Sequence, residues 1–382
     1  MASLAAEAQW RQVRSATLCL KTAGRSSGGA AGPLHSSCGF ALGLSRWSDG
    51  LSVQPHPCEQ PFRVVVLMST FNGQRYVAAQ LQSILAQLPA GGRIDIRDDG
   101  SSDGTVDVIR GLNDARISLT IGSNCGFGSS FLTLLAAVPA DADLVMFADQ
   151  DDIWLPCKVD RAWSHLKPLA GRPGLYGSAQ ILVDAELRPL QVTPPWPRAP
   201  SLANALTENI ITGCTAALNR PALKCLQSAG LPSGVYFHDW WLYLVISAFG
   251  DVIFDEVPTL LYRQHGRNQI GHGIGWFGRQ AAIVRFLLRH DWVGILLRQV
   301  CALRRHYGGD LGADRLAAIE RQFVFGADGA EASWRLIFSP RRRRQRARDE
   351  LPLRVLLAAH KLRLWPLPGW RLAAQTKSRA DA

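Results

Sequence analysis

Asp149, Asp151 and Asp152 place three carboxylates within four consecutive positions, directly after the apolar run 144–148. Carboxylates this close repel one another unless a cation lies between them. Oxygen ligands of this kind suit Mg²⁺ or Mn²⁺, and these ions in turn suit a substrate that carries phosphates. A simple polar turn is the alternative, because Asp is common in turns after strands. The spacing alone leaves both interpretations open.

Two further polar turns lie upstream, and each follows a run typical of a β-strand. The first reads STFNG at 69–73, and the second reads DDGSSDGT at 98–105. Asp103 in the second turn can cap the helix that follows. The side chains of interest in these turns are Ser69, Thr70, Asn72, Asp98 and Asp99.

The elements around these turns alternate between strand and helix. Strands are predicted at 63–69, 93–97, 117–121 and 144–148, and helices at 76–85, 106–112 and 127–138. This alternation with short polar turns favours an α/β fold with a parallel, doubly wound sheet. Ligands of such sheets bind beyond the carboxyl ends of the strands. We therefore expect the three polar turns to converge on one crevice.

Together with ITGCTAALNR (211–220), FHDWWLYL (237–244) and YRQHGRNQIG (262–271), these turns resemble the family 2 glycosyltransferases. The rhamnosyltransferase-like branch of that family is the most similar. The resemblance covers about 63–271 and implies the GT-A fold, a Rossmann-like, mostly parallel sheet flanked by helices. It implies a nucleotide-sugar donor such as dTDP-rhamnose or a UDP-sugar, bound with Mg²⁺ or Mn²⁺. The implied acceptor is a saccharide or a lipid-linked sugar in bacterial cell-surface polysaccharide synthesis.

The resemblance assigns roles to the acidic residues. Asp151 is the expected metal ligand and Asp149 its partner or a contact to the ribose and sugar, while Asp152 orients them. The carboxylate at Asp99 is expected to accept a hydrogen bond from the base, although the adjacent Asp98 could do so instead. Ser69, Thr70 and Asn72 are expected beside the nucleotide. A metal held in this way would neutralise the leaving diphosphate.

Asp239 matches the position of the family's general base. It opens the apolar run 240–249, so its carboxylate is expected to be partly desolvated and its pKa raised. The alternative is that Asp239 only caps that helix. One base without a second carboxylate nucleophile implies a single displacement, and hence inversion at the anomeric carbon.

The downstream motifs supply weaker predictions. His265 is expected at the metal or the diphosphate and Arg263 at the phosphates, although a lone His is more often structural. Arg97, directly before Asp98, stands where an apolar residue is commoner in the family and could loosen the burial of its strand. The residues predicted on the acceptor side are Gly213, Cys214, Thr215 and Trp240.

Composition divides the chain of 382 residues into three parts. Residues 1–61 lack periodicity and are expected to form a disordered extension, 62–275 the catalytic domain, and 276–382 a basic, amphipathic helical region. Through Gly275 there are 21 Lys and Arg against 22 Asp and Glu, a net charge of −1; the remainder has 21 against 9, or +12, which sums to the total of +11. The eight cysteines lack metal-ligand spacing and are expected to be free thiols in a reducing cytoplasm.

The basic C-terminal region predicts a peripheral contact with the anionic inner face of the cell membrane. A solvated helical cap on the catalytic domain is the alternative, and nucleic-acid binding fits poorly because no base-reading motif accompanies the charge. No apolar stretch reaches the roughly 18 to 20 residues that span a bilayer. Two other functions stay open, a nucleotidyltransferase and an inactive sugar-nucleotide-binding protein. The first turn, however, has no Lys or Arg before Arg75 to cradle phosphates.

Overall fold

The computed structural model describes residues 62–169, 171–228, 230, 232, 235–264, 291–327 and 329–364. The expected extension at 1–61, His265, and residues 276–290 and 365–382 of the expected basic region lie outside the described residues. The rest of the sequence predictions can be compared with the structure.

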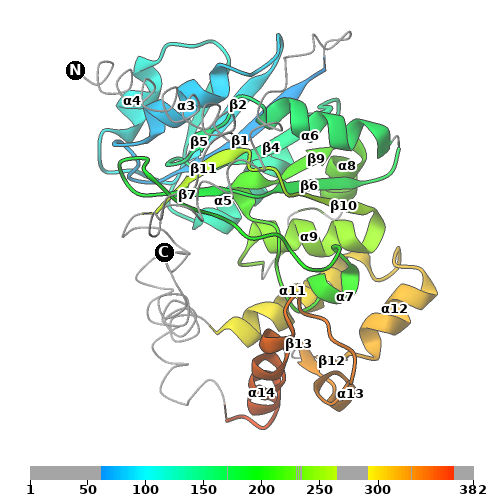
Figure 1. Cartoon of the computed structure of the whole chain (residues 1–382). Coiled ribbons are helices and arrows are strands. Elements are labelled where there is room, and N and C mark those ends of the chain that lie inside the picture. The colour runs from blue at the N-terminus through cyan, green and yellow to red at the C-terminus, as the bar shows by residue number, and fades with distance from the viewer. Residues whose placement is uncertain are drawn as a thin grey trace, which may run out of the picture.

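A seven-stranded sheet forms the centre of the molecule, in the order β10-β6-β9-β4-β1-β2-β3 (Figure 1). Its strands are β1 (Val64–Thr70), β2 (Arg93–Asp98), β3 (Ile117–Ile121), β4 (Leu144–Ala148), β6 (Gly174–Ser178), β9 (Ala217–Asn219) and β10 (Asp251–Asp255). Within it β9 runs antiparallel to β4 and β6, and the other neighbouring strands are parallel. The predicted α/β fold with a mostly parallel sheet is confirmed.

Strand β1 is buried on both faces, and its side chains alternate between two cores. Val64, Val66 and Met68 pack with α3 (Val77–Leu85) and α6 (Lys158–Leu166). The intervening Val65 and Leu67 pack on the opposite face with α5 (Phe127–Ala137) and α9 (His238–Phe249). This two-sided burial explains why β1 reads as a continuous apolar run. The remaining helical segments of this part are α4 (Thr105–Gly111), η2 (Lys167–Leu169), α7 (Leu202–Ala205), η3 (Gly213–Thr215) and α8 (Arg220–Ser228).

A smaller sheet holds the chain that follows the acidic turn. Its order is β5-β11-β7-β8, with β5 (Ile153–Trp154), β7 (Ile181–Val183), β8 (Pro189–Val192) and β11 (Leu260–Arg263). Strand β5 begins one residue after Asp152 and pairs antiparallel with β11. The acidic turn is therefore held between two sheets, β4 on one side and β5 on the other.

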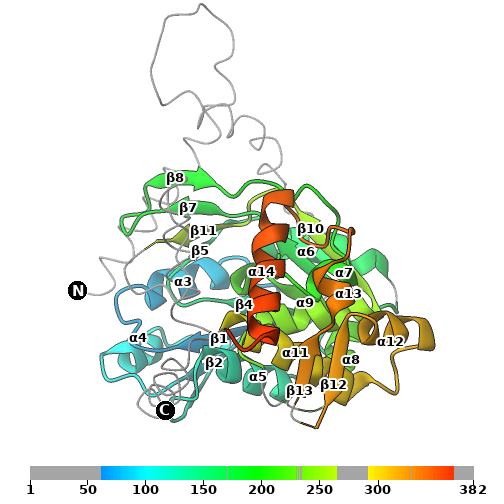
Figure 2. The ribbon, with the colours of Figure 1, turned by 90° about the horizontal axis from the view of Figure 1, so that it is seen from below.

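The described C-terminal residues pack against α9 and continue its hydrophobic core. Their elements are α11 (Trp292–Tyr307), α12 (Ala313–Glu320), β12 (Phe323–Gly326), β13 (Gly329–Ala332), α13 (Trp334–Ile337), η4 (Ala347–Asp349) and α14 (Glu350–Lys361). Figures 1 and 2 show them on the side of α9 away from the central sheet. The β12–β13 hairpin was not predicted from the sequence, which favoured helices throughout. No described helix is long and apolar enough to cross a membrane.

Candidate functional site

The acidic turn is anchored by two glutamine side chains. Gln150 pairs with the backbone of Phe71, accepting from its N–H at 2.9 Å and donating to its carbonyl at 3.0 Å. Gln80 on α3 donates to the carbonyl of Asp149 at 2.9 Å. A Cβ at Gly73 would lie 2.1 Å from Oε1 of Gln150, so a larger residue there would push the Gln150 side chain away from Phe71. These bonds fix the turn after β4 against the turn after β1.

Burial and mutual repulsion raise the pKa of the carboxyls in this turn. Desolvation, followed by the charge of Asp151, raises the pKa of Asp149 to about 7 and that of Asp152 well above its usual range. Asp149, Asp152 and Cys214 each offer a ligand atom, and these atoms lie within 4.8 Å of one another. Oδ2 of Asp152 is buried without a hydrogen-bond partner among the described residues. A crowded set of oxygen donors with an unsatisfied lone pair fits a divalent cation. This group contains Asp152 and Cys214 but not Asp151, the metal ligand predicted from the sequence.

Lys158 lies beneath the acidic turn with no exposed surface. Its Nζ is 4.9 Å from the ring centre of Trp154 and 3.4 Å from Oγ1 of Thr259. Desolvation lowers its pKa to about 8, and the nearby thiol and carboxylates oppose that shift. Lys158 was not among the site residues predicted from the sequence. Its spacing was a usable signal, because Lys158 lies four residues before Ala162 on the buried face of α6.

Arg263, at the end of β11, braces the same turn from the other side. Its backbone N–H donates to Oδ1 of Asp152 at 3.1 Å, and its Nε donates to the carbonyl of Asp151 at 2.8 Å. The guanidinium lies 4.6 Å from the ring centre of Tyr76 and also bonds the carbonyl of Ala185. A contact of Arg263 with phosphate stays a prediction.

Asp98 is fully buried and holds the corner between the first two turns. Its Oδ2 accepts from the hydroxyls of Thr70 and Ser101, both at 2.7 Å, and its Oδ1 accepts from the Ser101 N–H at 2.8 Å. Asn72 adopts φ of +49°, a conformation that Asn tolerates better than most residues. Its N–H donates to Ser101 and its Oδ1 accepts from the N–H of Ser102. The carboxylate of Asp98 thus joins the first polar turn, through Thr70, to the second, through Ser101.

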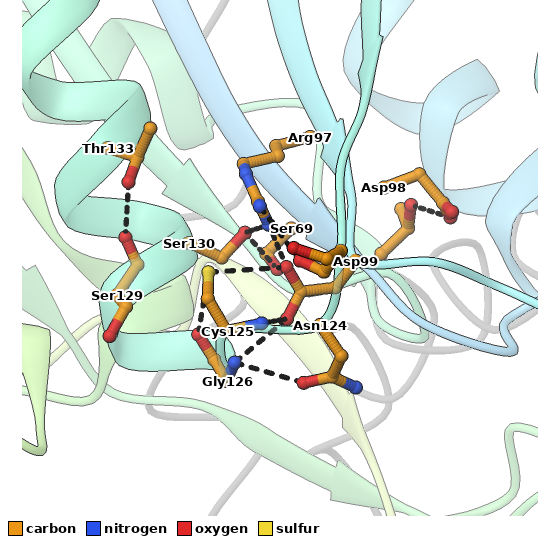
Figure 3. Close-up of polar contacts among 12 residues, drawn as sticks. Ser69, Arg97, Asp98, Asp99, Asn124, Cys125, Gly126, Ser129, Ser130 and Thr133 are labelled. Carbon is orange, nitrogen blue, oxygen red and sulfur yellow. Dashed lines mark hydrogen bonds and ion pairs between the residues drawn. The ribbon is translucent and has the colours of Figure 1, made fainter. Parts of the chain in front are cut away.

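Asp99 faces the loop that leads into α5 (Figure 3). Its Oδ2 accepts from the N–H groups of Cys125 and Gly126 at 3.1 and 3.0 Å. Arg97 forms an ion pair with it. Arg97 is thereby only partly exposed, and β2 keeps its regular alternation of buried and partly buried residues. The ion pair with Asp99 compensates the charge of Arg97. The predicted possibility that Arg97 loosens the burial of this strand is therefore not realised.

Ser69 is linked to the same loop region. Its hydroxyl donates to Oγ of Ser130 on α5 at 2.8 Å. Arg97 also donates to Oγ of Ser130, at 3.4 Å, and to the carbonyl of Ser123, at 3.0 Å. Figure 3 shows these side chains gathered around Asp99. The end of β1, the end of β2 and the start of α5 are therefore one connected polar network.

Asp239 lies in the first turn of α9, close to the acidic turn. Its two oxygens accept from the N–H groups of Trp240 at 2.7 Å and Gly213 at 3.2 Å. Burial nevertheless raises its pKa to about 6, and its charge contributes to the raised pKa of Asp149. The helix itself begins after Phe237, without a side-chain cap. Asp239 is therefore inside the first turn of α9 and is not its N-cap residue.

His238 supports Asp239 from within the core. Its ring stacks on Phe131 at 4.2 Å, and desolvation lowers its pKa to about 3, so it stays neutral. A Cβ at Gly213 would lie 2.8 Å from Nε2 of His238. Only glycine therefore allows the backbone N–H of residue 213 to reach Asp239 past this ring. The sequence analysis gave His238 no role.

The predicted acceptor-side residues divide into two groups. Gly213, Cys214 and Thr215 form the short 3-10 helix η3 beside the carboxylates, and all three are buried. Trp240 is 3% exposed, donates from Nε1 to the carbonyl of Ala205 at 2.7 Å, and stacks on Trp292. In this structure Trp240 belongs to the core rather than to an open acceptor surface.

The chain is similar to several known proteins. Residues 65–226 match the family described as Glycosyl transferase family 2. The dTDP-rhamnosyl transferase RfbG of Shigella flexneri is 27% identical over 237 residues, which are 59% of this chain and 80% of that protein. The UDP-Glc:alpha-D-GlcNAc-diphosphoundecaprenol beta-1,3-glucosyltransferase WfgD of Escherichia coli is 26% identical over 191 residues, or 48% of this chain and 70% of that protein.

Among solved structures, the mannosyltransferase PcManGT of Pyrobaculum calidifontis, in complex with GDP-Man and Mn²⁺, is 17% identical with a TM-score of 0.44. That alignment covers 100% of this chain and 92% of the other.

Proposed function

This chain belongs to glycosyl transferase family 2 and transfers a sugar from a nucleotide sugar, and from that premise we propose an inverting, metal-dependent transferase of bacterial cell-surface polysaccharide synthesis. One observation carries the proposal. Asp239, a carboxyl of raised pKa, lies close enough to Asp149 for its negative charge to raise the pKa of Asp149 as well. A base and a cation-binding carboxylate set are the two parts that such a transfer needs.

The carboxylates of the acidic turn would hold Mg²⁺ or Mn²⁺, with Asp149, Asp151 and Asp152 as the oxygen donors. Bound there, the ion would neutralise charge on the leaving diphosphate. Lys158 and Arg263 keep the turn in place from two sides. Their positive charges offset part of the carboxylate repulsion, so the turn can stay folded before the ion binds.

Asp239 would take the proton from the attacking acceptor hydroxyl. A carboxyl with a pKa of about 6 is ionised near neutral pH, yet it is more basic than an ordinary Asp. Its two backbone N–H donors fix its direction. The acceptor oxygen, once Asp239 takes its proton, would attack the anomeric carbon directly as the nucleoside diphosphate leaves. A single displacement of this kind would invert the configuration at that carbon.

The base and phosphates of the donor would lie along the first two turns, with Thr70, Asn72 and Asp99 nearest to them. The similarity to the Shigella protein supports dTDP-rhamnose, and the similarity to the Escherichia coli protein supports a UDP-sugar and a lipid-linked acceptor. An acceptor carried on lipid would place the reaction at the inner face of the cell membrane.

Donor binding by the full chain tests the proposal. UDP-, dTDP- and GDP-sugars would be titrated with Mn²⁺, with Mg²⁺ and with EDTA, on the wild type, on Asp151→Ala and on the surface control Asp107→Ala. We expect metal-dependent binding of one donor, weakened in Asp151→Ala and unchanged in Asp107→Ala. A folded protein that binds none of the donors with either metal would contradict the proposed function.

A further inference from the structure

Helix α14 carries two apolar stripes on opposite faces. Leu353 and Leu357 are buried against the rest of the C-terminal region. Leu351 and Val355, on the other side of the helix, are 69% and 58% exposed, and Leu362 directly after the helix is 56% exposed. Spacings of four and seven residues keep these three side chains on one face. The buried stripe is enough to pack an amphipathic helix onto the protein, so the exposed stripe is not needed for folding.

The short helix α13, which packs against α14, adds exposed aromatic side chains. Trp334 and Phe338 are 44% and 74% exposed, and their rings stack at 5.6 Å. Nζ of Lys361, on α14, lies 5.8 Å from the ring centre of Trp334. We call the exposed apolar side chains of these two adjacent helices the α13–α14 face: Trp334, Phe338, Leu351, Val355 and Leu362. Figures 1 and 2 show both helices on the side of the molecule away from the central sheet.

Exposed apolar side chains are concentrated here. Ten large hydrophobic residues are exposed in the described part of the chain, and six of them lie between 334 and 364. Single exposed apolar residues are ordinary, whereas a contiguous group marks a surface that binds something.

The charge around this face is strongly positive. Residues 334–364 contain ten Lys and Arg but only two acidic residues, Asp349 and Glu350. Both acidic residues are already paired, with Arg348 and Arg354. Arg335, Arg341 and Arg342 are exposed, and within the described residues none of them forms an ion pair with a carboxylate. The occupant of the face must therefore offer negative charge around an apolar surface.

We propose that the α13–α14 face docks the protein onto an anionic lipid bilayer. The apolar side chains would enter the boundary between headgroups and acyl chains, and the arginines would contact the lipid phosphates. A soluble anion would satisfy the arginines but would leave Phe338 and Leu351 in water. The inference rests on the proposed function in one respect: a lipid-linked acceptor gives the enzyme a reason to work at that surface.

Vesicle co-sedimentation of the full chain tests the face directly. The vesicles would be phosphatidylcholine alone or phosphatidylcholine with phosphatidylglycerol, without donor or metal. We expect binding to the anionic vesicles that falls at least tenfold in Phe338→Asp/Val355→Asp. Arg341→Glu/Arg342→Glu, which changes only exposed charges, should also weaken binding and remove most of its dependence on salt. Ile121→Asp is the matched control, because Ile121 is 50% exposed on β3, outside this face.

Two results would overturn the inference. One is equal vesicle binding by the wild type and Phe338→Asp/Val355→Asp, with both folded by circular dichroism. The other is a dimer of the wild type in lipid-free solution that the same variant dissociates, since the face would then bind a second copy. Because the assay needs no turnover, its failure leaves the proposed function standing. Conversely, a protein that binds vesicles but no donor would refute only the proposed function.

Discussion

Two sets of carboxylates lie at the same edge of the central sheet, and their surroundings are opposite. Asp98 and Asp99, after β2, accept hydrogen bonds from hydroxyls and backbone N–H groups, and Asp99 also has Arg97. Asp149 and Asp152, after β4, are crowded together with few donors, and their pKa values are raised. The first set stabilises the fold, and the second carries charge that the fold alone does not compensate.

This difference shows where the molecule sacrifices stability for function. Satisfied carboxylates add to the free energy of unfolding, whereas desolvated ones of like charge subtract from it. Such a subtraction persists when activity requires it. A cation or a reacting hydroxyl would supply what Asp149, Asp152 and Asp239 lack. Changes in the two sets should therefore have opposite effects on stability.

The largest effect is expected from Asp239→Asn. An amide cannot accept the acceptor proton, so kcat should fall about a thousandfold, the middle of the range for a general base. Donor affinity should stay within about twofold, since the donor carboxylates are untouched. Steady-state kinetics and donor titration would separate the two quantities. The control is Asp251→Asn, at the start of β10. A variant that keeps most of its turnover would remove Asp239 from the role of base.

Metal removal should have the next largest effect. A divalent ion supplies several kcal/mol to the stabilisation of a leaving diphosphate, so EDTA should lower turnover by about a hundredfold or more. Added Mn²⁺ or Mg²⁺ should restore it and raise Tm, because an ion that binds only the folded state stabilises that state. Full activity after exhaustive chelation would show that Lys158 and Arg263 suffice as the positive charges of the site.

Asp98→Ala tests the satisfied set. The change removes three hydrogen bonds and leaves the Ser101 N–H and the Thr70 hydroxyl without their acceptor, at a cost of about 3 kcal/mol in the free energy of unfolding. Urea unfolding would measure the loss. The exposed Asp107→Ala on α4 should change the same quantity by less than about 0.5 kcal/mol. Equal values for the two variants would mean that Asp98 is not a stabilising residue.

Much of the sheet edge could be predicted from the sequence, because strand, turn and helix leave local signals. The apolar run at β1, the Asp-Gly turn after β2 and the acidic turn after β4 appear where expected. The β12–β13 hairpin was missed, since each of its strands has only four residues, too few to show a clear alternation, and helices lie on both sides. The C-terminal elements also proved to share the core of α9, a contact between distant segments that periodicity does not report.

The supporting residues of the site were harder to foresee. Gln80, Gln150 and Lys158 make contacts with residues that are distant in the sequence and meet them only in the folded chain. The role of His238 likewise depends on its packing against Gly213. Trp240 shows the converse. Its type allowed a sugar-stacking role, but the approach of α7 and α11 buries it. Residue type and spacing thus predicted the position of a side chain well where the local backbone alone determines it.

Asp149→Asn should stabilise the metal-free protein, by the smallest of these effects. The folded-state pKa of Asp149, about 7, lies above the ordinary value of 3.8. The folded protein thus holds a proton that the unfolded chain has lost between these values, so wild-type stability falls as pH rises from about 4 to about 7. The amide removes that loss, with a gain on the order of 2 kcal/mol at pH 8 and none below about pH 4.

Urea unfolding with EDTA across this pH range would measure the effect of Asp149→Asn, and Asp114→Asn is its control of opposite sign. Hydrogen bonds and the charge of Arg116 lower the pKa of Asp114 to about 2. Its ionised form therefore favours folding, and the amide should bring no gain at pH 8. A loss of stability in Asp149→Asn would mean that the second set is compensated as fully as the first, and the contrast between the two sets would not hold.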